Sequence, residues 1–216
     1  HKEEYSDAAW KSLYDTHRLA HLHRLTLLVQ PYKRNGSLYR GMGPKVVTGE
    51  GEPRLAFSDW DARFGRFLDG SAFRDLPREA QPVTHFQLPF NYHSRPTSPD
   101  PKRGHHPTPR GYPYIRGPIE QAVSADHGRQ NSALLAQFLN HVVDRGWIRT
   151  EYQVSLVNHP RRGELSSWWA LGAPQTLDDL LALRFFLRPY REAIDGVNGV
   201  RARIRQIADD PSVLRG

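Results

Sequence analysis

Four short apolar segments alternate with four longer amphipathic segments along this chain of 216 residues. The longer segments repeat apolar residues every three or four positions, as helices do, whereas the short segments have the length and composition of buried strands. The predicted order is helix 5–24, strand 25–30, helix 59–68, strand 82–90, helix 118–145, strand 152–157, helix 177–194 and strand 200–204. Such alternation indicates an α/β fold with a parallel sheet and right-handed crossovers.

The number of predicted strands sets the architecture. A closed eight-stranded barrel usually takes about 250 residues, so four strands are half of one. We therefore expect parallel βα repeats in a TIM-barrel-like arrangement, as a partial barrel of about four βα units, or else an open sheet. Residues 1–216 are expected to form a single domain that is a segment of a longer polypeptide.

The chain is basic, with a formal net charge of +7. Such a charge suits nucleic acid or acidic polysaccharide, but the basic residues are scattered and form no focused stripe. Cysteine is absent, which excludes disulfides and thiolate metal sites. No apolar run approaches the roughly 20 residues that cross a bilayer. These observations leave nucleic-acid binding as a secondary alternative and imply no membrane segment.

The candidate binding residues follow the predicted strands, because ligands of parallel α/β folds meet the carboxyl ends of strands. Aromatic rings can stack on the apolar face of a sugar, while amide and imidazole groups bond its hydroxyls. For the two tryptophans, capping of the hydrophobic core is an equal alternative. The residues expected to contact a carbohydrate are Tyr32, Asn91, Tyr92, His93, Asn158, His159, Trp168 and Trp169.

Acid–base and metal chemistry have fewer candidates. Glycoside hydrolysis normally needs two carboxyl groups, and Glu164, after the third strand, is the best-placed acid. Glu151 begins that strand and therefore lies at the opposite end from the expected site. His17 and His21 have a spacing that can hold a metal, but no matching Glu accompanies them, so we interpret them as solvated helix residues. No metal and no cofactor are expected.

Several segments in order resemble a known family. The segments are 64–73, 87–91, 138–141 with 146–147, and 167–169 leading to Pro174 and the helix 180–186, preceded by His17 and Arg18. Together they are similar to bacterial glycoside-hydrolase-type barrel domains related to the family 123 hexosaminidases, including the uncharacterised domains grouped with them. The resemblance implies a barrel, a glycan substrate, a mechanism that uses the N-acetyl group of the substrate, and a secreted or cell-envelope location.

The resemblance also implies an acidic Asp-Glu pair directly before a proline. In this chain Gly172 and Ala173 precede Pro174, and neither can transfer a proton or stabilise a cation. We therefore expect a glycan-engaging domain in which hydrolysis of an O-glycosyl bond would require Glu164 or another chain. The alternatives are a structural or assembly module that packs against other parts of a longer polypeptide or a partner chain, and a nucleic-acid-binding domain.

Overall fold

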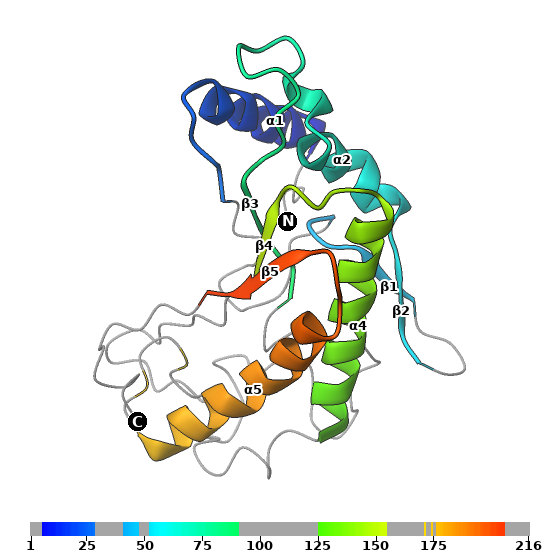
Figure 1. Ribbon diagram of the computed structural model, residues 1–216, viewed down its shortest axis with the longest axis vertical. Coiled ribbons are helices and arrows are strands. Elements are labelled where there is room, and N and C mark those ends of the chain that lie inside the picture. Colours follow the sequence, from blue (N-terminus) through cyan, green and yellow to red (C-terminus); the bar gives the residue numbers. More distant parts are fainter. Residues whose placement is uncertain are drawn as a thin grey trace.

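The computed structural model describes residues 6–28, 41–47, 52–90, 125–154, 171, 174 and 176–205 (Figure 1). The elements in chain order are α1 (Asp7–Leu22), β1 (Lys45–Val47), β2 (Arg54–Ala56), α2 (Ser58–Leu68), the 3-10 helix η1 (Ser71–Phe73), β3 (His85–Gln87), α4 (Ala125–Asp144), β4 (Glu151–Val154), α5 (Leu177–Asp195) and β5 (Arg201–Ile204). In Figure 1, α1 and α2 lie at one end of the molecule and α5 at the other, with α4 running between them.

A parallel three-stranded sheet in the order β3-β4-β5 organises the fold. Phe86 lies opposite Tyr152, which in turn lies opposite Ala202. Helix α4 joins β3 to β4, and α5 joins β4 to β5. The predicted α/β fold with a parallel sheet is therefore confirmed, and the described strands form no closed barrel.

One face of this sheet packs on an aromatic core. Tyr152 and Phe138 of α4 have ring centroids 6.3 Å apart, and Trp60 of α2 contacts both Phe138 and Phe86 edge to face. The Tyr152 hydroxyl donates a hydrogen bond of 2.8 Å to the Trp147 carbonyl. Because a buried phenol has this partner, the aromatic ring can lie in the core without an unsatisfied polar group.

Several local features of the sequence set the ends of the helices. Ser6 caps α1 by accepting a hydrogen bond from the Ala9 amide, and Thr176 forms a reciprocal capping box with Asp179 at the start of α5. Gly70 has a φ of 81°, and a Cβ there would lie 2.1 Å from the Ala80 carbonyl oxygen, so only glycine fits. Ser58, by contrast, is the first residue of α2 and does not cap it.

The predicted first strand is wrong over residues 25–28, which form no strand; residues 29–30 lie outside the described part of the chain. The Leu25 amide bonds back to the Ala20 carbonyl, and Arg24 adopts a φ of 60°. Leu25 and Leu28 are 65% and 50% exposed, so this apolar run is not buried. Thr26 instead contacts the Thr84 hydroxyl at 2.5 Å, beside β3.

The segment 33–53, in which the sequence predicts neither helix nor strand, contains β1. This strand pairs with β2 in a two-stranded antiparallel sheet, with Val46 opposite Leu55. Each strand has only three residues. A strand is recognised in a sequence by alternation of polar and apolar residues over at least four positions, so these two strands give no clear signal. None of the helices in the described part of the chain is long and apolar enough to cross a membrane.

His17 and His21 are buried, so their interpretation as solvated residues was wrong. Their rings stack on Phe67 and Phe73, with centroids 4.4 and 3.9 Å apart respectively. The Nε2 atom of His21 lies 2.9 Å from the Gln81 carbonyl oxygen, whereas neither ring nitrogen of His17 has a hydrogen-bond partner among the described residues. Burial lowers the pKa of His17 to about 4 and also lowers the pKa of His21.

We predict that His17 makes the fold acid-sensitive. The folded-state pKa of about 4 lies below the ordinary value of 6.5, so the unfolded chain binds a proton first. The free energy of unfolding is therefore unaffected by His17 above about pH 6.5 and falls between that pH and about 4, by on the order of 3 kcal/mol. Urea unfolding of wild type and His17→Phe across this range measures the difference.

The control for this experiment is His23→Gln, because His23 is exposed just beyond α1. We expect it to keep the acid sensitivity of wild type, whereas His17→Phe loses the part that His17 contributes. Equal pH dependence in wild type and His17→Phe would contradict the assignment.

Candidate functional site

The second face of the parallel sheet is polar. Strand alternation places His85 and Gln87 of β3 on the same face as Glu151 and Gln153 of β4. The register pairs His85 with Glu151 and Gln87 with Gln153, and on the far side it pairs Glu151 with Arg201 and Gln153 with Arg203. These six residues form two adjacent rows across three strands. Arg205 continues the pattern, because its amide bonds to the Val154 carbonyl directly after β5.

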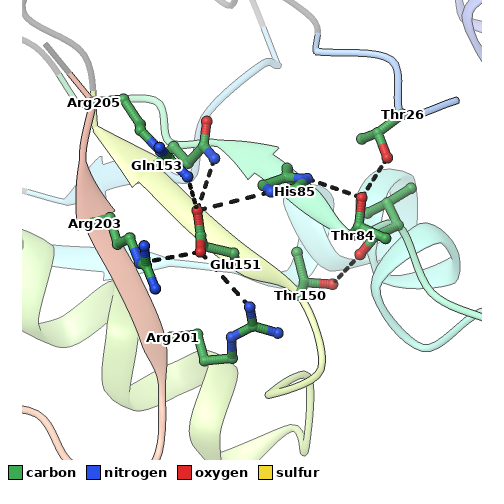
Figure 2. A network of polar contacts seen from close by, with 10 residues as sticks. Thr26, Thr84, His85, Thr150, Glu151, Gln153, Arg201, Arg203 and Arg205 are labelled. Atoms are coloured by element: carbon green, nitrogen blue, oxygen red, sulfur yellow. Dashed lines mark hydrogen bonds and ion pairs between the residues drawn. The ribbon is translucent and has the colours of Figure 1, made fainter.

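Glu151 lies at the centre of this face (Figure 2), and its side chain is only 3% exposed. Its Oε1 atom accepts hydrogen bonds of 2.9 Å from Gln153 Nε2 and from Arg205 Nη2. Its Oε2 atom lies 3.2 Å from Arg203 Nε and 3.7 Å from Arg201 Nη2. The side chains of Arg201, Arg203 and Arg205 are 62%, 62% and 51% exposed. A buried carboxylate thus lies among three largely exposed guanidinium groups.

These contacts keep Glu151 ionised. Burial acts to raise the pKa of the carboxyl group, but the hydrogen bonds from Gln153 and Arg205 and the charges of Arg203 and Arg205 outweigh it. The pKa of Glu151 therefore lies below its ordinary value. A carboxylate held in this way has no proton to donate at neutral pH, and its oxygens are already bound by cations. Glu151 is therefore unsuited to act as a general acid.

A chain of hydroxyl and imidazole contacts borders the same face. His85 Nδ1 lies 2.9 Å from Thr84 Oγ1, and Thr84 contacts Thr26. The Thr150 hydroxyl donates to the Val83 carbonyl at 2.7 Å. His85 Nε2, however, is 3.8 Å from Glu151, beyond hydrogen-bond reach. The carboxylate, the imidazole and the hydroxyl therefore do not form a proton relay that would activate a nucleophile.

Donors dominate this face. Three guanidinium cations around one carboxylate leave a formal excess of two positive charges. Among the described residues, the buried Nε2 atom of Gln87 has no hydrogen-bond partner. A buried amide without a partner is costly, and a ligand acceptor would satisfy it. The arrangement is chemically suited to bind a ligand rich in acceptor oxygens.

The sequence-predicted site residues all lie outside the described part of the chain, as do Gly172 and Ala173. Their predicted roles therefore stay predictions. The residues concerned are Tyr32, Asn91, Tyr92, His93, Asn158, His159, Glu164, Trp168 and Trp169. The structure does establish that β3 and β4 run parallel and adjacent, so their carboxyl ends lie at one edge of the sheet.

The sequence interpretation missed the Glu151 cluster for two reasons. Glu151 begins its strand, at the end opposite the expected site, and the arginines of β5 belong to a basic charge that forms no focused stripe along the sequence. A usable signal was present: Arg201, Arg203 and Arg205 occupy alternate positions, as do Glu151 and Gln153. A period of two places each set on one face of a strand. The sequence does not show that the arginines and the Glu151 and Gln153 pair lie on the same face of the sheet.

The described residues outside the polar face provide no second candidate site. An open groove between α4 and α5 has a volume of about 830 Å³ and is lined by small residues of α4 with Leu181, Phe185 and Pro189 of α5. Its Glu192 pairs with Arg188 on the same helix at 2.9 Å, as on an ordinary solvated helix surface. Within the described ranges, no group of three or more His, Cys, Asp or Glu side chains could hold a metal ion.

Comparison of the chain with protein-family profiles, with curated proteins and with solved structures finds no match.

We predict that removing the negative charge of Glu151 destabilises the fold less than removing the positive charges of the three arginines. Glu151→Gln should cost only about 1 kcal/mol, because the three arginines are mostly exposed and water can solvate them. Replacing all three arginines with Gln should cost more, on the order of 3 kcal/mol, because a buried carboxylate then loses its compensating charges. Urea unfolding at about pH 7 compares the two, with Arg191→Gln on exposed α5 as the control.

The pH dependence provides a second readout. In the triple variant burial acts without nearby cations, so the pKa of Glu151 rises above its unfolded value and stability is regained as the pH falls. In wild type the change with pH is the opposite. The pKa of Glu151 is lowered by folding, so the stabilisation that this carboxylate contributes is lost as the pH falls. A Glu151→Gln variant less stable than the triple variant would refute this account.

Proposed function

We propose that this chain is a glycan-binding α/β domain whose ligand lies against the polar face and the carboxyl edge of the parallel sheet. We further propose that the sheet is part of a TIM-barrel-like arrangement, in which this face is turned to the interior. The observation that carries the proposal is that the central strand, β4, alternates polar and apolar residues. Parallel strands covered by helices on both faces are normally apolar throughout, so this face has another role.

The chemistry of the face supports a carbohydrate ligand. Amide, guanidinium and imidazole groups all donate hydrogen bonds to hydroxyl oxygens, and Gln87, Gln153 and His85 stand in adjacent positions on two strands. The sequence-predicted contacts Asn91 and Trp169 follow β3 and β4 along the chain. The resemblance to glycoside-hydrolase-type domains points to the same class of ligand.

The proposed activity is binding without hydrolysis. Glu151 is held as a carboxylate by its cations, and Gly172 and Ala173 stand where the resemblance would place an acidic pair. We expect no release of aglycone from aryl N-acetylhexosaminides or other aryl glycosides. Hydrolysis by wild type that is lost in Glu164→Gln would contradict this proposal and identify Glu164 as the acid. Equal hydrolysis in both proteins would also contradict it but exclude Glu164.

Glycan binding is tested with an array of neutral and acidic glycans, followed by calorimetry on the best ligand. Trp169→Ala should weaken binding about tenfold, the effect of removing one stacking ring. Leu19→Ala is the control, because Leu19 is an exposed apolar side chain on α1 and lies outside the parallel sheet. Far-ultraviolet circular dichroism checks that both variants fold. The absence of binding to any glycan would refute the proposed function.

A further inference from the structure

We propose that Arg201, Arg203 and Arg205 bind an anionic group on the ligand, so that the ligand of this domain is an acidic glycan carrying a carboxylate or a sulfate. This inference rests on the proposed function and deepens it, because it specifies the class of glycan.

The first support is the number of unused donors. A guanidinium group has five N–H donors in a planar fork that matches carboxylate and sulfate oxygens. Arg203 and Arg205 each use one nitrogen to contact Glu151, and Arg201 approaches it only to 3.7 Å. The described residues provide no further acceptor for these groups. Most of the donors on a surface with two excess positive charges are therefore available to an anion.

The second support is the position of Glu151. Three like charges on one strand repel one another, and long side chains lose conformational entropy when a ligand immobilises them. The buried carboxylate holds the three guanidinium groups together before any ligand arrives, while each stays more than half exposed. Its hydrogen bonds with Gln153 and Arg205 fix its own orientation. Glu151 is thus a positioning residue that preorganises an anion site.

The neighbouring strand distinguishes an acidic glycan from a nucleic acid. Gln87 lies next to Gln153 in the sheet and offers a buried donor without a partner among the described residues, which suits a sugar hydroxyl beside the anionic group. Nucleic acid requires a long basic track that neutralises many phosphates. On this face of the described sheet the three arginines lie on β5 and at the residue directly after it, and the Glu151 carboxylate among them would repel a second phosphate.

The test uses a matched pair of ligands: a hexauronate oligosaccharide and the same oligosaccharide with its carboxyl groups reduced to hydroxymethyl groups. Each is titrated into the full chain by calorimetry at about 0.15 M salt. We expect the acidic form to bind at least about tenfold more tightly. Arg203→Gln should weaken binding of the acidic form about tenfold, the effect of one charge-assisted hydrogen bond, and leave binding of the reduced form unchanged.

Three further variants make the result specific. Arg203→Lys keeps the charge without the planar fork and should fall between wild type and Arg203→Gln. Arg191→Gln removes an exposed arginine paired with Asp195 on α5 and should bind as wild type does. If Arg203→Gln does not fold, Arg201→Gln replaces it, because Arg201 makes no hydrogen bond to Glu151 and its loss disturbs the cluster least.

The outcomes separate the two proposals. Equal affinity for the acidic and the reduced oligosaccharide overturns the anionic inference and leaves glycan binding intact. The absence of binding to either, together with a blank glycan array, overturns both. A sulfated neutral hexasaccharide distinguishes the anionic groups, and tight binding of either acidic form supports the inference. Tighter binding of single-stranded RNA, with a steep salt dependence, overturns it in favour of a nucleic-acid ligand.

Discussion

Packing of β4 against α4 positions the rest of the sheet. Tyr152 and Val154 are fully buried, and Tyr152 contacts Phe138 while its hydroxyl bonds to the turn between helix and strand. Because these two side chains lie in the core, the alternation of side chains along the strand places Glu151 and Gln153 on the opposite face of the sheet. Both neighbouring strands pair with β4, so they follow its register. The polar face is a direct consequence of how the apolar face packs.

Electrostatics on this polar face favour recognition over proton transfer. A carboxylate that acts as a general acid needs a raised pKa, which usually comes from burial without nearby cations. Glu151 is buried, but the hydrogen bonds from Gln153 and Arg205 and the charges of Arg203 and Arg205 reverse the effect of burial on its pKa. The same contacts gather three cations at one place and leave most of their donors unused. One cluster therefore explains why we propose a binding domain and why we expect an acidic ligand.

Much of the fold was predictable from local signals. The helices predicted over 5–24 and 177–194 are present as α1 and α5, and local caps, Ser6 before α1 and Thr176 before α5, mark where they start. The segment 25–28 was predicted wrongly because an apolar run favours a strand only where a partner buries it, and here Leu25 and Leu28 face solvent. The two histidines of α1 were misinterpreted for a related reason: they are buried beside the half-buried Trp10, Leu13 and Tyr14, whereas Leu19 and Leu22 of the same helix are exposed.

The sequence alone specifies the order of helices and strands in the sheet-forming part, because caps, glycines at positive φ and residue periodicity act between near neighbours. It also places Arg201, Arg203 and Arg205 on one strand face. It does not specify that this face is shared with Glu151. Arg205 and Glu151 are 54 positions apart, and their contact requires the strand order β3-β4-β5 and its register. Strand order and register are set by which apolar faces pack together, a property of the whole chain rather than of any segment.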